Sequence, residues 1–378
     1  MSVSLPDARE LAAAEAAQIN ANPEQALQTP LKRALMDAPW LDREAVIAGT
    51  VAFHRERMQR VPAPAKYPEA GPWVQLAIDV DRELQALTGI SDEQLALRRS
   101  LREYMTFRCH EAVAARPSGE EKCRALYVPE SEHGEIHVKN LDDPSWHWKP
   151  RPPIEAMPSV NELRMDGVGS GLHIDDEPDE IFPLQPRQMV THYCNDVPGA
   201  VQFMQRYSPF WGRANLLLFD AQRRSVAIEK CSFNHCEVFE PDAHGRSFIS
   251  GMTCRDADSP QGRHQQRMRE RAVGMSGRAD DDSPDRAFWA ACRRFHEKLR
   301  DAVVGWGERV SLDEVIRLFT TPAPEGLNKE NARFHPDQPI DAWTLATTVW
   351  LRDQRRVLRW QRAEGTMAWP TEPEVYQF

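Results

Sequence analysis

The feature that most constrains the fold is a change of pattern near Gly119. Before it, apolar residues recur at helical spacing, as in residues 42–60 and 73–87. After it, short apolar or alternating runs are separated by turn residues, which is typical of β-strands. Helical patterns then return before a final strand pair. This order of helices, many strands, helices and strands predicts an α+β fold.

The first third of the chain predicts three helices and a connector. Ser91 and Gln94 form a capping box for a helix that runs to about residue 115. The proline-rich residues 61–72 separate the two helices before it. We therefore expect three regions along the chain. They are a helical N-terminal extension at 1–62, a second helical region at 73–122, and a domain at 123–378 that carries the strands.

The remaining elements are predicted from apolar runs and turn signals. Two strands at 123–129 and 135–140 flank a turn. Further strands are expected at 163–168, 171–174, 188–193, 215–219, 225–230, 235–239 and 247–252, and a last hairpin at 344–351 and 357–361. Helices are expected at 197–207, 263–275 and 284–304, and at 312–319 under a Ser311/Glu314 capping box.

Charge and composition exclude several functional classes. The net charge of −10 and the interleaving of acidic and basic residues argue against nucleic acid as a partner. No apolar run is long enough to span a membrane, and the first residues do not form a secretory signal. The seven cysteines are an odd number without C-x-x-C pairs, so we expect free thiols and a cytoplasmic location.

Cys123 is the first candidate for chemistry. It opens the string Cys-Arg-Ala-Leu-Tyr-Val-Pro, and after a turn the chain returns through Gly-Glu-Ile-His-Val-Lys-Asn-Leu-Asp, which ends at Asp142. This resembles the start of the catalytic chain in the penicillin acyltransferase family of N-terminal nucleophile hydrolases. Members of that family begin with Cys, run down a strand and return through a hairpin that ends in Gly-x-Asn-x-Asp.

The resemblance continues in order along the chain and covers about residues 78–378. The matching segments include residues 83–89, 166–175, 194–206, 215–229, 250–252, 262–269, 333–337 and 344–346. By resemblance, the α+β fold would be a four-layer αββα sandwich, with two antiparallel sheets between helical layers and a helical N-terminal segment.

The resemblance also implies a mechanism. The chain would cleave itself between Lys122 and Cys123, and the freed α-amine, with an ordinary pKa near ~8, would become the base that activates the thiol. Asp142 would orient this amine. Arg333 would hold a carboxylate or stabilise developing negative charge. Asn140 would contact the substrate as part of the Asn-x-Asp motif.

The sequence departs from the family pattern at two places. The family supplies its oxyanion donor from the Asn of a Thr-Asn-His triplet, whereas the matching residues here contain none. The backbone N–H of Gly251, or alternatively Asn234, would replace it. In the family a small residue usually precedes the cysteine and Thr commonly follows it, whereas this chain has Lys122 and Arg124. This difference favours slow or absent self-cleavage. It also leaves open a repurposed binding module of the same fold.

The expected activity is an amide hydrolase or acyltransferase with a small acyl-amino or acyl-thioester substrate. No metal or cofactor is expected, and a coenzyme A thioester would serve as co-substrate in the transfer reaction. Trp146 and Trp148 either line the substrate pocket or form a packed corner, and His173 is a further candidate for substrate contact. The sequence says nothing about the oligomeric state.

A second enzyme class remains open. His173 and Asp175 form a His-x-Asp pair, and His235 with Arg246 follows later in the chain. Iron(II)/2-oxoglutarate oxygenases use two histidines and a carboxylate on iron, with an arginine for the co-substrate. This alternative leaves the Cys123 string unexplained.

Overall fold

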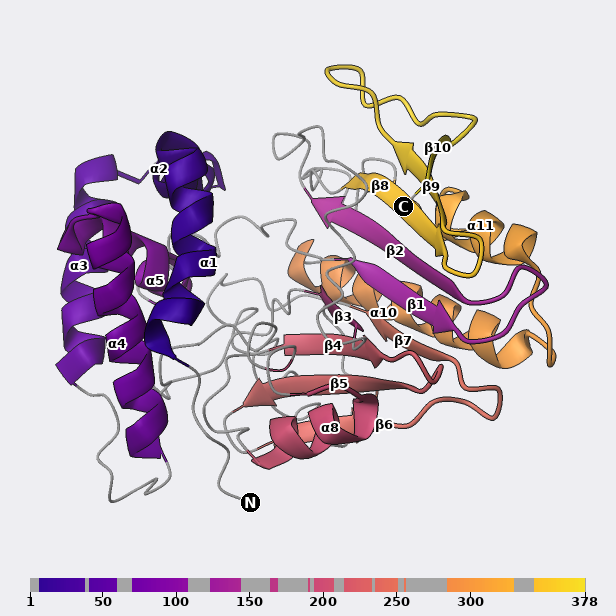
Figure 1. Cartoon of the computed structure of the whole chain (residues 1–378). Coiled ribbons are helices and arrows are strands. Elements are labelled where there is room, and N and C mark those ends of the chain that lie inside the picture. The colour runs from indigo at the N-terminus through magenta and orange to yellow at the C-terminus, as the bar shows by residue number, and fades with distance from the viewer. Residues whose placement is uncertain are drawn as a thin grey trace. The chain divides into compact units, whose positions relative to one another are not determined.

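A computed structural model describes residues 7–37, 41–59, 70–107, 123–143, 164–168, 190, 194–206, 214–232, 235–250, 255, 284–329 and 343–377. The described residues fall into two units, which Figure 1 labels by element. One unit contains helices α1 to α5. The other contains every described strand together with helices α8, α10 and α11. Among the described residues, no helix combines the length and the apolar character that a bilayer crossing requires.

The first unit is helical, as the sequence predicts. Its helices are α1 (Ala8–Ala21), α2 (Pro23–Asp37), α3 (Arg43–Gln59), α4 (Ala70–Thr88) and α5 (Asp92–Phe107). Helix α1 packs on α4, and α3 packs on α5. The predicted capping box of α5 is confirmed. The Ser91 N–H donates to Gln94 Oε1 at 2.8 Å, and the Gln94 N–H donates to Ser91 Oγ at 3.2 Å.

The second unit contains a six-stranded antiparallel sheet in the order β10-β9-β8-β2-β1-β7 (Figure 1). Its strands are β1 (Arg124–Val128), β2 (Ile136–Asp143), β7 (Ser247–Ser250), β8 (Trp343–Leu351), β9 (Arg356–Gln361) and β10 (Glu374–Gln377). Strand β1 therefore lies between two partners. Arg124 pairs with Asn140 of β2 on one side and with Ser250 of β7 on the other.

A second antiparallel sheet has four strands in the order β3-β4-β5-β6. They are β3 (Arg164–Val168), β4 (Ala214–Phe219), β5 (Ser225–Ser232) and β6 (His235–Phe239), and helix α8 (Val197–Arg206) contacts β6. Strands β4 and β5 are joined by a tight turn in which Asp220 accepts backbone N–H groups from Gln222 and Arg224.

Successive side chains of a strand point to opposite faces of the sheet, and the two faces of the six-stranded sheet pack against different elements. On one face, Leu126 and Val138 pack with Phe295 of α10 (Pro284–Gly305) and Phe319 of α11 (Leu312–Thr320). On the other face, Ala125 and Tyr127 pack against β4 and β5 of the four-stranded sheet. The predicted capping box of α11 is confirmed. The α+β class is confirmed as well.

Three expected elements differ from the structure or lie outside it, and one observed strand is not among those expected. The predicted strand at 188–193 is wrong at Val190, which is helical and accepts the Cys194 N–H at 2.9 Å. Strand β10 was not predicted, because its residues are mostly exposed and its only described partner strand is β9. The strand at 171–174 and the helix at 263–275 lie outside the described residues.

Candidate active site

Cys123 lies immediately before β1, with a backbone φ of +36°. This left-handed region costs a non-glycine residue about 1–2 kcal/mol, so the backbone of Cys123 itself is strained. The residue is only 8% exposed and packs with Ala125, Leu217 and Ile249. Its environment is therefore the layer between the two sheets.

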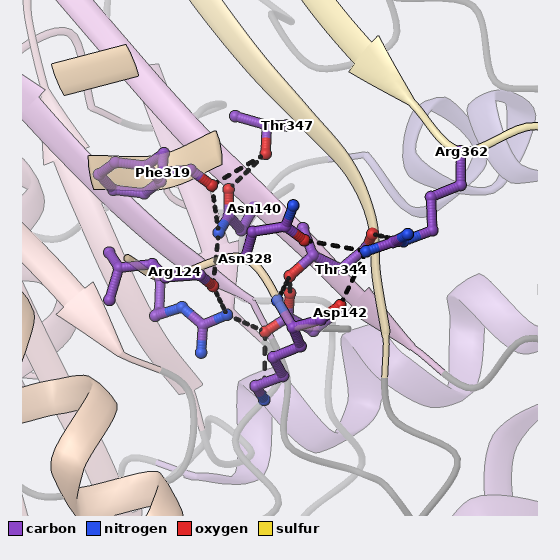
Figure 2. Close-up of polar contacts among 10 residues, drawn as sticks. Arg124, Asn140, Asp142, Phe319, Asn328, Thr344, Thr347 and Arg362 are labelled. Atoms are coloured by element: carbon purple, nitrogen blue, oxygen red, sulfur yellow. Dashed lines mark hydrogen bonds and ion pairs between the residues drawn. The ribbon is translucent and has the colours of Figure 1, made fainter. Parts of the chain in front are cut away.

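A buried polar cluster surrounds Asp142 on the other face of the same sheet (Figure 2). Asp142 Oδ2 accepts from the guanidinium of Arg124 and lies 3.3 Å from Lys329 Nζ, while Oδ1 accepts from Thr344 Oγ1 at 2.8 Å. The side chains of Arg124, Lys329 and Asp142 are at most 1% exposed. One carboxylate is thus in ion-pair contact with two buried cations.

Phe295 of α10 supports both cations of this cluster. Arg124 Cζ lies 4.5 Å from the ring centroid, and Lys329 Nζ lies 5.0 Å from it. An aromatic face attracts cations, and the attraction strengthens when water is excluded. The helix layer therefore contributes to the site beneath β1.

Further contacts attach the segment that follows α11 to the sheet. Asn140 Nδ2 donates to Phe319 O at 3.3 Å and to Leu327 O at 3.2 Å, and its Oδ1 accepts from Thr347 at 2.7 Å. Arg362 donates to the backbone oxygens of Thr344 and Lys329 and to Asn328 Oδ1. Asn140 is fully buried, so it anchors this segment here, and its substrate contact stays a prediction.

The structure brings Cys123 and Asp142 to the same end of the β1–β2 pair but not to the same face. Cys123 packs toward the four-stranded sheet, whereas the carboxylate of Asp142 is held by Arg124 on the helix face. A β-bulge between Leu141 and Asp142 lies at this point. The role of Asp142 toward the α-amine of Cys123 stays a prediction.

The other predicted site residues fall outside the described part of the chain. They are Gly251, Arg333, Trp146, Trp148 and His173, together with Asp175 and Asn234. Their predicted roles therefore stay predictions.

Arg246, the arginine of the oxygenase alternative, has a structural role. Its guanidinium donates to the carbonyl oxygens of Trp306 and Glu308 at 3.2 and 2.9 Å, and also to that of Gly307. These carbonyls follow the end of α10, where a cation is favourable. Within the described ranges, no three His, Cys, Asp or Glu side chains gather as metal ligands.

Sequence reasoning did not identify Lys329, Thr344 or Arg124 as partners of Asp142. Arg124 could have been found from its position beside Cys123, as the unusual residue after the predicted nucleophile. Lys329 carries no such signal, because only the folding of the segment after α11 brings it to β2.

Glu229 is a second buried acid, on β5, which lies between β4 and β6. Its Oε2 accepts the backbone N–H of Arg255 at 3.1 Å, and its Oε1 lies 3.7 Å from Arg255 Nε. Burial raises the pKa of Glu229 to about 7 despite the nearby Arg255. Burial likewise raises the pKa of the Cys194 thiol to about 12, so Cys194 is protonated at neutral pH.

The raised pKa of Glu229 predicts a pH dependence of stability. The folded protein holds a proton on Glu229 up to about pH 7, whereas an unfolded chain releases it near 4.5. The unfolding free energy that this retained proton contributes is fully present below pH 4.5 and is lost as the pH rises through 7. We expect the unfolding free energy of the wild type to fall relative to Glu229→Gln over this window in urea titrations. An equal pH slope for both proteins would contradict the assignment.

Comparisons with known proteins give distant structural similarities. No family model matches the chain, and no curated protein matches it in sequence. A mutant of the conjugated bile acid hydrolase from Clostridium perfringens is similar in structure, with a TM-score of 0.37 and 11% identity over 68% of this chain and 97% of that one. Penicillin V acylase from Agrobacterium tumefaciens has a TM-score of 0.36 and 15% identity over 67% of this chain and 84% of that one. At these scores the similarities carry no conclusion about this chain.

Proposed function

We propose that the chain is a cysteine-dependent amide hydrolase or acyltransferase that cleaves itself before Cys123. The observation that carries the proposal is the position of Cys123. It stands at the head of an inner strand with buried residues on both faces, in a strained backbone conformation, between two stacked antiparallel sheets. Strained residues of this kind cluster at functional sites.

The strain suits a self-cleavage step. The Cys123 thiol would attack the carbonyl carbon of Lys122, the C–N bond would break, and the α-nitrogen of Cys123 would leave as an amine bearing the thiol's proton. Water would then hydrolyse the resulting thioester and release the carboxylate of Lys122. Relief of the left-handed conformation in the transition state would lower the barrier, because the strained ground state then starts at a higher free energy.

The freed amine would then serve catalysis. It would accept the thiol proton, and the thiolate would attack the carbonyl carbon of an amide or acyl thioester and form an acyl-enzyme. Water would release an acid, or an acceptor amine would take the acyl group. The proposed roles of Gly251 as oxyanion donor and of Arg333 as anion partner belong to this step.

The Asp142 cluster supports this arrangement from the helix side. Arg124 follows Cys123 directly and is fixed by Asp142 and by Leu327 O at 2.9 Å. Because these contacts hold Arg124, the backbone of the preceding residue, Cys123, has little freedom to move. The cluster therefore supports a preorganised nucleophile, which is what efficient attack requires.

The remaining expectations complete the proposal. The substrate would be a small acyl-amino compound or an acyl thioester such as a coenzyme A ester, with Asn140, Trp146, Trp148 and His173 as candidate contacts. Helix α8 would form part of the outer layer of an αββα sandwich over the four-stranded sheet. A cytoplasmic location is also part of the proposal, because the seven cysteines are an odd number without C-x-x-C pairs.

A binding module is the second candidate. Asp142 already accepts from Arg124 and Thr344 and lies in ion-pair contact with Lys329, which favours a purely structural role for this carboxylate. In that case the chain would stay intact and Cys123 would be unreactive.

The intact mass of the purified chain tests the proposal. We expect two fragments divided between Lys122 and Cys123 in the wild type, and one unbroken chain in Cys123→Ala. Cys194→Ala is the matched control, since this buried thiol has no role in the proposed reaction, and it should be cleaved like the wild type. An intact wild-type chain whose Cys123 also resists iodoacetamide would overturn the proposal in favour of the binding module.

A further inference from the structure

The side chain of Arg255 lies where an edge strand of each sheet meets helix α10. Strand β7 ends the six-stranded sheet, and β6 ends the four-stranded sheet. Arg255 Cζ lies 4.0 Å from the ring centroid of Phe248 on β7 and 5.0 Å from that of Phe239 on β6. Helix α10 contributes His296, whose ring centroid lies 5.7 Å from that of Phe248. Two aromatic rings therefore hold the guanidinium in place.

The guanidinium of Arg255 is buried, yet Nε and Nη2 have no hydrogen-bond partner among the described residues. Its side chain is only 15% exposed, and both nitrogens are closed to solvent. Glu229 Oε1 lies 3.7 Å from Nε, beyond the range of about 2.7–3.2 Å for an N–H···O hydrogen bond. The other oxygen of Glu229 accepts the backbone N–H of Arg255 at 3.1 Å. Glu229 therefore holds the main chain of Arg255 and leaves these two side-chain donors unused.

Other buried arginines of the chain do use their guanidinium groups. Arg124 donates to Asp142 and to a backbone oxygen. Arg246 donates to carbonyl oxygens that follow α10, and Arg362 donates to backbone oxygens as well. A buried charged donor without an acceptor is costly, and such a group in a folded protein indicates a partner of another kind, such as a bound ion.

The two unused nitrogens indicate the chemical class of the partner. Nε and Nη2 lie on the same edge of a guanidinium, and their N–H bonds point in parallel. This fork matches the two oxygens of a carboxylate, which it binds through two hydrogen bonds. A carboxylate would also supply the opposing charge that a buried cation requires.

His296 is a second buried polar group at the same place. It is 4% exposed, and its Nδ1 has no hydrogen-bond partner in the described part of the chain. Burial, followed by the charge of Arg255, lowers the pKa of His296 to about 4, so the ring is neutral at pH 7. Two neighbouring polar side chains therefore both lack partners, which is more typical of a ligand site than of a closed core.

We propose that Arg255 binds the carboxylate of a small organic acid at the junction of β6, β7 and α10, with Nε and Nη2 as the two donors. The contacts that carry this proposal all belong to described residues. The proposal does not rest on the proposed function, because Cys123 has no part in it.

Glu229 should control the affinity of this site. Burial raises the pKa of Glu229 to about 7. The protonated acid leaves the charge of Arg255 to the ligand, whereas the ionised acid neutralises Arg255 and repels a second carboxylate. Between pH 6 and pH 8 the protonated fraction of Glu229 falls about tenfold, so the apparent dissociation constant should rise about tenfold.

Other charged groups act on the same region. Glu237 of β6 acts on Glu229, and three residues of α10 act on His296, namely Arg293, Arg300 and Asp301. The variant Glu229→Gln isolates the titration of Glu229 from these groups, because it leaves them unchanged. It also keeps an oxygen that can accept the Arg255 N–H.

A titration of the purified protein with sodium acetate tests the proposal. In protein labelled with ¹⁵N-arginine, NMR follows the Nε–H signal of Arg255, which Arg255→Lys identifies by its loss. We expect a saturable shift of this signal with acetate, about tenfold weaker binding at pH 8 than at pH 6, and little change with sodium chloride at equal ionic strength. Glu229→Gln should bind acetate at pH 6 like the wild type and lose the pH dependence.

Arg293→Gln is the matched control, because Arg293 is an α10 arginine near His296 whose side chain is 58% exposed. Its affinity for acetate should equal that of the wild type. If Arg255→Lys fails to fold by near-UV circular dichroism, a nuclear Overhauser contact between the Nε–H and the ring of Phe248 identifies the signal instead. The proposal is wrong if acetate leaves this signal unmoved or shifts it only as chloride does. It is equally wrong if saturation disappears in Arg293→Gln, because the anion would then bind the surface of α10.

Discussion

An Asp142→Asn variant is expected to lose about 3–5 kcal/mol of unfolding free energy, because it leaves the buried Arg124 and Lys329 without the opposing charge they now have at Asp142. The side chains of all three residues are at most 1% exposed, so water cannot replace the lost carboxylate charge. Urea denaturation of the purified protein, followed by fluorescence, measures the difference.

The matched control for this variant is Asp301→Asn on α10. Asp301 pairs with Arg300 at 2.8 Å, but the two side chains are 66% and 53% exposed. Such surface pairs contribute about 0–1 kcal/mol, so the control should be nearly neutral. If Asp142→Asn is no more destabilising than Asp301→Asn, the cluster does not hold β1, and the support it gives to the proposed nucleophile disappears.

The second large effect concerns activity. Cys123→Ala is expected to abolish the hydrolysis of acyl p-nitroanilides, since loss of a nucleophile costs up to about 10⁶-fold in kcat. Turnover numbers should be measured on freshly purified protein together with the extent of self-cleavage. The stability of the variant should change little, because Ala125 and Leu217 already provide an apolar surrounding for the side chain.

Cys194→Ala provides the comparison for this variant. Cys194 is also buried, and burial raises its pKa to about 12, so it supplies almost no thiolate at neutral pH. We expect its turnover to remain near that of the wild type. An equal loss of turnover in the two variants would point to a general effect of thiol removal on packing. Full activity in Cys123→Ala would exclude Cys123 as the proposed nucleophile.

Local signals in the sequence predicted most of the local structure. The capping boxes at Ser91 and Ser311 are both present, because a cap needs only residues three positions apart. The strand–turn–strand pattern after Cys123 is also present as β1 and β2. The failures have local causes too. Apolar residues around Val190 favoured a strand, and the exposed β10 has little pattern of its own.

The sequence by itself determined the α+β class, the position of Cys123 at the head of a strand, and the Asp142 motif on the next strand. Only the tertiary structure decided that Lys329 meets Asp142, that Glu229 meets Arg255, and that Asn215 meets Ser250. These contacts join strands of different sheets or loops distant in the chain. Their geometry depends on how the sheets stack and on how the segment after α11 folds onto β2, which no local spacing of residues encodes.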